Sequence, residues 1–590
     1  MGTIEIKKRE ILLDGKSVKI HSGAMHYFRI HPDYWRDRIV KLRQCGLNCL
    51  ETYMCWNRHE PRPGQFDFSG WLDIERYVQM AQKEGLLVMV RPGPYICSEW
   101  DLGGMPSWLL KDPQMHLRCR YEGYWKYAKR YMDEVLSRLK KWQYTEGGPI
   151  IMMQIENEYG SYGNDHEYLE ELRQCYVDHG FTIPLYTADG NTPHHLAAGT
   201  VPGTMACVDG RNHPARLVKA LNDFNPDNPP FVMELWNGVA FHWQEQCREH
   251  EAEPVREDIK EALANGINFN LYMFHGGTNF GFMNGANGGN CPYKPLITSY
   301  DVNGTLNEEG DPTPKYFAVQ EELCKARGIP AEKPVILPKK AYGKIELTEV
   351  ASLYDALPAL GQWKEYFRAP RMEEIDQDYG FIMYRYRLTV PGAYPVELFE
   401  LRDRAIILVN GVPAGTLYRN DPEPHRVTVT IPEGGADVDV LVENMGRINY
   451  GYLMNEDRKG IAFMGVAYAM REMFNLKAIS LPMNDISGIT YKPFEPVNGP
   501  AFYRGHFHAE TVCDTFIKIP GGVKGNVWLN GFNLGRYWNV GPQLTLYAPA
   551  PLLKKGDNEV VVFEQHAMGE AGVESVDKRD FGVSVPMKLS

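Results

Sequence analysis

The sequence lacks the features that would assign it to a membrane or a nucleic acid. No part of its 590 residues approaches the roughly 18 consecutive apolar residues of a membrane-spanning helix. The first ten residues alternate apolar and polar side chains and then turn basic, without the apolar core of a secretory signal. The net charge is −12, and no run rich in lysine and arginine stands out. We therefore expect neither a membrane nor a nucleic acid as partner.

Cysteine and histidine lack the spacings of a metal site. The eleven cysteines are an odd number, and none forms a Cys-x-x-Cys pair. Ten of them lie within the first 330 residues, and we interpret them as buried thiols in a reducing cytoplasm. Cys45 and Cys49 flank a predicted helix–strand junction without a further ligand pair. We expect no metal and no organic cofactor.

Apolar runs of strand length alternate with helical patterns through the first 330 residues. This βαβ rhythm predicts a (β/α)₈ TIM barrel over residues 1–330, so the fold class is α/β followed by all-β. The predicted strands are 18–22, 49–53, 86–91, 150–155, 183–186, 205–208, 231–235 and 267–274.

The remainder of the chain has an all-β composition. Prolines punctuate a predicted linker over 331–370, which is able to contribute a strand to the β domains that follow. Similar short segments recur at separations of 119 to 121 residues, which indicates two copies of one β-sandwich, 371–480 and 481–590. The recurring pairs are Tyr384 and Tyr503, Asn410 and Asn530, and Val440 and Val561.

Two predicted barrel strands end in glutamate. Strand 150–155 leads into Glu156-Asn157-Glu158, and strand 231–235 contains Glu234, with Trp236 two residues further on. Carboxylates at the carboxyl ends of barrel strands are where such a fold places its chemistry. Glu156 and Glu158 could be ordinary loop charges, but a second strand of the same design favours a paired site.

Two facing carboxyl groups can cleave a glycosidic bond, because one protonates the leaving oxygen and the other supplies electron density to the anomeric carbon. Glu158 and Glu234 suit these roles. Their separation would be about 5–5.5 Å in a retaining site and roughly 6.5–9.5 Å in an inverting one. Other predicted strand ends carry polar and aromatic groups that suit a sugar. They include Tyr53, Cys97, Ser98, Glu99 and Tyr300.

The motifs around these residues resemble those of glycoside hydrolase family 35, the β-galactosidases. They are Glu51 to Pro61, Arg91 to Leu109, Gln154 to Gly160 and Gly276 to Gly281. The motifs fall between residues 23 and 316, and the two β domains are similar to that family's galactose-binding-like jelly rolls in architecture.

The resemblance implies a retaining exo-β-galactosidase. Glu158 would be the acid/base and Glu234 the nucleophile, and a further set would hold the terminal galactose. That set is Tyr53, Ser98, Glu99, Asn157 and Tyr300. Ser98 stands where alanine is common, and Val239 stands where a bulky aromatic is usual. These departures concern the leaving-group side of the pocket.

Specificity beyond the galactose is predicted to depend on Trp236 and Trp243, with Tyr450 from the first sandwich beside them. The compact length looks most like bacterial members that prefer short β-1,3-linked galactosides. Two alternatives stay open: another exo-β-glycosidase, such as a glucosidase or glucosaminidase, and a galactoside-binding protein without turnover. A homodimer is among the assemblies that the sequence leaves open.

Overall fold

The first unit of the structure is a closed parallel β-barrel, as predicted. The computed structural model describes residues 2–289, 291–300, 302–466, 471–569, 572–582 and 585–587. Eight strands close in the order β10-β12-β4-β5-β6-β7-β8-β9. They are β4 (His21–Met25), β5 (Cys49–Tyr53), β6 (Leu87–Arg91), β7 (Ile150–Gln154), β8 (Leu185–Gly190), β9 (Met205–Gly210), β10 (Phe231–Trp236) and β12 (Asn268–His275).

Two of the predicted strands are displaced along the chain. The first was expected at 18–22 and lies at β4, because Lys16–Val18 forms β3 in a separate antiparallel sheet with β1 (Ile4–Lys7) and β2 (Glu10–Leu13). The fifth was expected at 183–186 but begins at Leu185, directly after Pro184. Proline has no amide hydrogen to donate to a strand ladder, which accounts for the later start.

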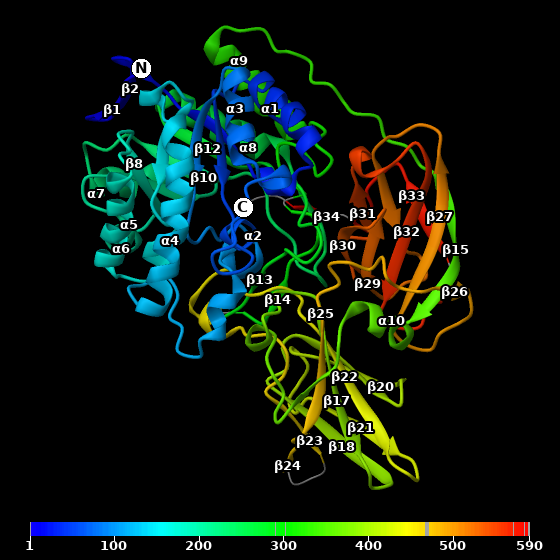
Figure 1. The fold of residues 1–590 in the computed structure, drawn as a ribbon. Coiled ribbons are helices and arrows are strands. Elements are labelled where there is room, and N and C mark those ends of the chain that lie inside the picture. Colours follow the sequence, from blue (N-terminus) through cyan, green and yellow to red (C-terminus); the bar gives the residue numbers. More distant parts are fainter. Residues whose placement is uncertain are drawn as a thin grey trace.

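Helices cover the outside of the barrel (Figure 1). α3 shows why: Ile74, Tyr77, Val78 and Ala81 are buried at helical spacing, and Asp73 caps the first turn by accepting a hydrogen bond from the amide of Arg76. The helices are α1 (Trp35–Gln44), α3 (Ile74–Lys83), α4 (Glu122–Leu139), α5 (His166–Asp178), α6 (Pro193–Gly199), α7 (Pro214–Phe224), α8 (Ala252–Ala264) and α9 (Pro314–Arg327).

Two β domains follow the barrel, one beside it and one below it in the view of Figure 1. The first contains a sheet in the order β16-β25-β17-β22-β19-β20, and the second contains β30-β29-β32-β27-β15-β33-β28-β31. Their bounds are β15 (Gly343–Ser352), β16 (Lys364–Tyr366), β17 (Phe381–Leu388), β19 (Arg404–Val409), β20 (Val412–Tyr418), β22 (Ala436–Glu443), β25 (Leu476–Leu481), β27 (Ala501–Ala509), β28 (Thr515–Lys518), β29 (Lys524–Leu529), β30 (Phe532–Trp538), β31 (Thr545–Ala548), β32 (Gly556–Glu564) and β33 (Gly572–Val576).

The similar short segments occupy matching places in the two sheets. The neighbours β17-β22-β19-β20 in the first domain have the same order as β27-β32-β29-β30 in the second. Asn410-Gly411 and Asn530-Gly531 form the corresponding hairpin turns, and all four residues have positive φ. The segment 331–370 contributes β15 to the second domain and β16 to the first, so the chain visits the second domain before it builds the first.

The cysteines are all free thiols. Most are buried as expected, but Cys291 is exposed and Cys119 is partly exposed. Within the described ranges, no helix has both the length and the apolar character needed to cross a membrane.

A buried ion cluster joins the barrel to the first β domain. Arg447, which follows β22, is fully buried and contacts Asp101 of the barrel at 3.1 Å and Glu373 at 2.6 Å. Its amide also donates to Asp101 at 2.6 Å. A second bridge between the same two units, Lys111 to Asp376, is half exposed on both sides.

We expect Arg447→Met to lower the free energy of unfolding by about 3–5 kcal/mol, because two buried carboxylates lose their cation. Lys111→Met is the matched control and should change it by less than about 1 kcal/mol, since water replaces the partner. Urea denaturation followed by tryptophan fluorescence measures both. Equal losses in the two variants would contradict this account of the junction.

Candidate active site

The two glutamates singled out in the sequence line one cavity at the carboxyl ends of the barrel strands. Glu234 lies in β10, and Glu158 follows β7 on the other side of the barrel mouth. The cavity has a volume of about 350 Å³. Its other lining residues are Cys97, Ser98, Glu99, Arg211, Trp236, Gly238, Val239, Ala240, Tyr272, Asn287, Tyr300 and Tyr450.

The Glu234 carboxylate is held by three donors. The Tyr53 hydroxyl and Arg91 Nη1 donate to Oε1, each at 2.8 Å, and Trp236 Nε1 donates to Oε2 at 3.0 Å. Arg91 is completely buried, so its charge acts in a region of low dielectric constant. These contacts fix the orientation of the carboxylate and stabilise its negative charge.

The side-chain nitrogen of Asn157 lies near the Glu234 carboxylate without a hydrogen-bond partner among the described residues. Asn157 Oδ1 accepts from Arg91 at 2.6 Å and from Gln154 at 3.1 Å, which fixes the orientation of the amide. The Tyr53 hydroxyl, whose single proton is shared with Glu234, lies 2.9 Å from the same oxygen. The unpaired Nδ2 of Asn157 is buried. A buried donor of this kind favours a ligand that accepts its hydrogen bond.

Glu158 occupies a different environment. It has a left-handed backbone conformation, with φ of 45° and ψ of 40°, and no hydrogen bond from a described residue reaches its carboxyl oxygens. Burial, followed by the charge of Glu234, raises the pKa of Glu158 to about 8. The side chain is partly exposed and lines the cavity, and its raised pKa favours the protonated form at neutral pH.

Glu156 points away from this cavity. Arg118 binds it through two parallel hydrogen bonds, Nε to Oε1 at 2.9 Å and Nη2 to Oε2 at 2.7 Å, and both side chains are buried. Glu156 also accepts from the amide of Asn157 at 2.6 Å. It therefore holds the turn that carries Asn157 and Glu158.

Three consecutive residues after β6 have left-handed backbone conformations at the cavity wall. Cys97, Ser98 and Glu99 have φ values of 54°, 59° and 49°, and such strained backbone persists where the surroundings enforce it. Here Arg29 provides part of that support by donating to the Ser98 carbonyl and, at 2.7 Å, to its hydroxyl. The hydroxyl of Tyr300 donates to Glu99.

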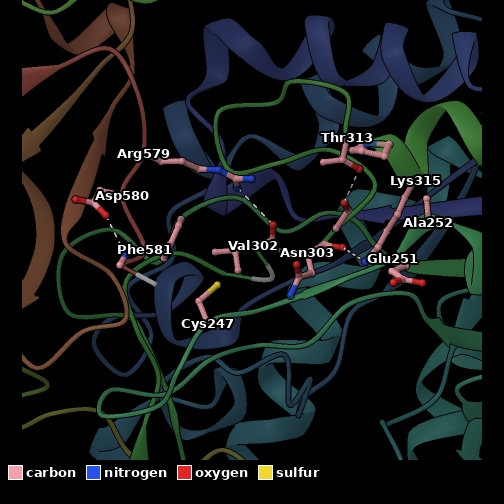
Figure 2. A pocket seen from close by; sticks show the side chains of 13 residues that line it. Cys247, Glu251, Ala252, Val302, Asn303, Thr313, Lys315, Arg579, Asp580 and Phe581 are labelled. Atoms are coloured by element: carbon pink, nitrogen blue, oxygen red, sulfur yellow. Dashed lines mark hydrogen bonds between the residues drawn. The ribbon is translucent and has the colours of Figure 1, made fainter. Parts of the chain in front are cut away.

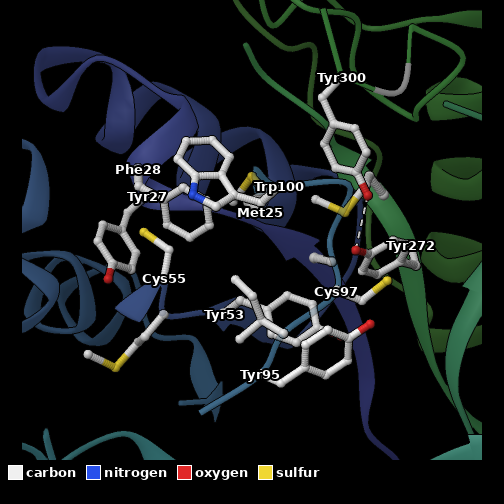
Figure 3. Close-up of a cluster of buried hydrophobic side chains, with 14 of the residues drawn as sticks. Met25, Tyr27, Phe28, Tyr53, Cys55, Tyr95, Cys97, Trp100, Tyr272 and Tyr300 are labelled. Atoms are coloured by element: carbon white, nitrogen blue, oxygen red, sulfur yellow. Dashed lines mark hydrogen bonds between the residues drawn. The ribbon is translucent and has the colours of Figure 1, made fainter. Parts of the chain in front are cut away.

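Aromatic side chains lie behind this wall. Figure 3 shows Tyr272 and Tyr300 joined through their hydroxyls, which are 3.0 Å apart. The ring centre of Tyr53 lies 6.3 Å from that of Tyr272. The Arg29 guanidinium lies 4.0 Å from the centre of the Tyr300 ring, a cation–π contact. Tyr272 and Tyr300 also line the cavity.

The two tryptophans at the end of β10 and in the loop that follows it are placed differently. Trp236 lines the cavity, as does Tyr450 from the first β domain. Trp243 is buried, with its ring centre 6.3 Å from that of Trp538 in the second β domain, and it is not part of the cavity lining.

Sequence reasoning did not single out Arg91, Arg211 or Tyr272 as site residues. A signal existed for Arg91, because an arginine at the end of the apolar strand Leu87–Arg91 needs a buried partner. Nothing local distinguishes Arg211 or Tyr272, whose roles depend on strands far apart in the chain.

A larger cavity of about 670 Å³ lies elsewhere and shares no lining residue with the first. Figure 2 shows Cys247, Glu251, Val302 and Arg579 around it. Neither glutamate of the pair faces it, so it is not the site of their chemistry. In the part of the chain that the structure describes, no group of three or more His, Cys, Asp or Glu side chains is arranged to hold a metal ion.

Comparison with known proteins gives matches along most of the chain. The model of glycosyl hydrolases family 35 matches residues 10–326, and models of the β-galactosidase first all-beta domain and galactose-binding domain match 370–482 and 500–558. The chain is 40% identical to beta-galactosidase-1-like protein 2 of Homo sapiens, over 96% of this chain and 90% of that protein. It is 40% identical to a beta-galactosidase of Xanthomonas manihotis (91% and 90%) and 38% identical to one of Bos taurus (98% and 94%).

The raised pKa of Glu158 predicts a pH-dependent stability cost. The folded protein holds this proton up to about pH 8, whereas the unfolded chain releases it near 4.5. Wild-type stability therefore falls across this window as the pH rises. Glu158→Gln has no ionisable group at this position, so we expect its free energy of unfolding to rise relative to that of the wild type between pH 5 and pH 8.

Urea unfolding at both pH values measures this difference. Glu510→Gln, at an exposed position of the second β domain, is the control and should follow the wild type. If the difference in the free energy of unfolding between Glu158→Gln and wild type were the same at pH 5 and pH 8, the raised pKa of Glu158 would be refuted.

Proposed function

The chain belongs to glycosyl hydrolase family 35 and is a glycoside hydrolase, and from this premise we propose a retaining exo-β-galactosidase that releases terminal non-reducing β-D-galactose. The beta-galactosidase names of the relatives support the choice of sugar. The resemblance to compact bacterial members supports short β-1,3-linked substrates.

The contrast between the two carboxyl groups at one cavity carries this proposal. Glu234 receives three hydrogen bonds, one of them from a buried arginine, and is a carboxylate suited to attack. Glu158 receives none from the described residues and keeps its proton at neutral pH. Environments that separate two carboxyl groups in this way assign one as the acid and the other as the nucleophile.

The reaction then proceeds in two displacements. Glu234 attacks the anomeric carbon while Glu158 gives its proton to the glycosidic oxygen, so the bond to the leaving group breaks and a galactosyl ester forms. Glu158, now a carboxylate, takes a proton from water as the water oxygen attacks the same carbon. The ester bond breaks, Glu234 leaves as a carboxylate, and β-galactose is released.

The cavity wall supplies groups for the sugar hydroxyls. The unpaired Nδ2 of Asn157 is a donor next to the nucleophile, and Glu99 is an acceptor fixed by Tyr300. Ser98 lines the same wall. A panel of nitrophenyl β-glycosides tests the sugar: hydrolysis of the galactoside above the glucoside and glucosaminide is expected, and the opposite order favours the alternative exo-glycosidase.

We expect Glu234→Gln to abolish turnover, because no ester can form. Glu158→Ala should slow disaccharides strongly but leave dinitrophenyl galactoside partly usable, since an activated phenolate needs little protonation. Azide should then restore activity to Glu158→Ala and yield β-galactosyl azide. Equal loss in both variants without azide rescue would refute these roles, and chromatography with NMR of the product distinguishes the outcomes.

Trp236 is expected to act twice, through its hydrogen bond to Glu234 and through its ring. Trp236→Phe removes the donor and keeps a smaller aromatic ring, so it should lower kcat/KM by similar factors for a disaccharide and for nitrophenyl galactoside. Trp236→Ala also removes the ring and should lower the disaccharide value several-fold further, since stacking contributes on the order of 1 kcal/mol. Trp243→Phe serves as a packing control. If Trp236→Phe and Trp236→Ala changed the ratio of the two kcat/KM values by the same factor, the ring would have no role in recognising the second sugar.

A further inference from the structure

A second cavity adjoins the first at Glu158. It has a volume of about 490 Å³ and shares Glu158, Arg211, Trp236 and Tyr450 with the first cavity. Its remaining wall comes from the turn after β7, from the ends of β8 and β9, and from the segments that lead into α6 and α7 together with the first turns of these helices. That wall is Ser161, Gly190, Asn191, His195, Asp209, Gly210, Asn212, His213, Arg216 and Leu217.

The position of the acid determines what each cavity can hold. A proton donor must reach the glycosidic oxygen, so the galactose lies on one side of Glu158 and the leaving group on the other. The first cavity contains Glu234, Glu99 and Tyr300. The second contains none of these, so it lies on the leaving-group side.

Arg211 lines both cavities and carries hydrogen-bond donors. It is exposed, no carboxylate of the described residues pairs with it, and its guanidinium carbon lies 5.7 Å from the centre of the Trp236 ring. Arginine carries five N–H donors in a planar fork. Beside an aromatic face, this is an arrangement that can bind a polyhydroxylated ring through its oxygens while the indole covers its apolar side.

Asp209 is an independent indication of a ligand at the base of the second cavity. It is 3% exposed, lies opposite Glu234 in the β9–β10 register, and neither carboxyl oxygen has a hydrogen-bond partner among the described residues. Asp189 of the neighbouring strand, also buried, accepts from the amide of Gly160 at 2.7 Å. Unpaired buried carboxyl oxygens are unfavourable unless something binds them.

We propose that the second cavity is the subsite for a sugar leaving group, and that Arg211 and Asp209 are its specificity-determining polar contacts. Burial, followed by the charges of Glu234 and Glu158, raises the pKa of Asp209 well above its usual range. The neutral acid that this favours can both donate to and accept from a sugar hydroxyl. The proposal rests on the proposed function, because it needs a galactosyl-enzyme and an acid at Glu158.

Competition between acceptors tests the subsite. Nitrophenyl galactoside is the donor, and the galactosyl-enzyme is offered water, methanol, and glucose or N-acetylglucosamine at fixed concentrations. Methanol needs no subsite contact, whereas the sugars do. Arg211→Met should lower the ratio of sugar transfer to methanol transfer by about tenfold, the effect of one hydrogen bond to a charged group. Asp209→Leu should lower it in the same direction, and Asp209→Asn by less, since the amide keeps a donor and an acceptor.

The matched control is Arg173→Met, which removes an arginine from α5 that pairs with Glu170 outside both cavities. An unchanged sugar-to-methanol ratio in both Arg211→Met and Asp209→Leu would overturn the subsite. If the wild type transfers galactose only to water, a second ratio tests the subsite: kcat/KM for a galactosyl disaccharide divided by kcat/KM for nitrophenyl galactoside. Arg211→Met and Asp209→Leu should lower this ratio, and an unchanged ratio in both variants would overturn the subsite. Absence of any galactose release from the wild type is a different outcome, which refutes the proposed function itself.

Discussion

The buried guanidinium of Arg91 is the interaction on which the rest of the site depends. It contacts Glu234 at 2.8 Å and Asn157 at 2.6 Å, lies 4.2 Å from the centre of the Tyr53 ring, and has Glu51 behind it at 3.7 Å. One fully buried cation on β6 therefore orients residues of β5 and β10 and of the turn that follows β7. Without it, Glu234 would be a carboxylate in a region of low dielectric constant with only two neutral donors.

This cation also limits how many charges the barrel mouth can hold. Glu51, Glu158 and Asp209 lie within reach of the same electrostatic field, and burial raises the pKa of each, to about 7 for Glu51 and about 8 for Glu158. A single arginine cannot offset four ionised carboxylates at this depth. The arrangement favours protons on Glu158 and Asp209, and a protonated Glu158 is the state that an acid requires.

The fold was more accessible to sequence reasoning than the details of the site. The bounds of strands such as Cys49–Tyr53 and Ile150–Gln154 agree with the prediction to within one residue. Short apolar segments bounded by polar residues mark where a buried strand begins and ends. Glu156 and Glu158 flank Asn157 symmetrically in the sequence. What separates them is Arg118, which is distant in sequence and binds Glu156. Arg91 is not identifiable as a site residue from its own segment, because its partners Glu234 and Asn157 come from other strands, and only the closed barrel brings those strands together.

The β domains take part in shaping the cavity as well as packing beside the barrel. The Tyr95 hydroxyl donates to the carbonyl of Asn449 at 2.7 Å, and Asn449 Nδ2 donates to the sulfur of Cys97 at 3.5 Å, so the left-handed turn at the cavity wall is supported from the first β domain. The next residue, Tyr450, lines both cavities. The buried ion cluster of Arg447 stands only two residues before Asn449 and fixes this segment against the barrel. An isolated barrel would retain the carboxylates but lose one wall of both cavities. The domain junction is therefore a part of the site, and its stability and the shape of the cavity depend on the same short segment.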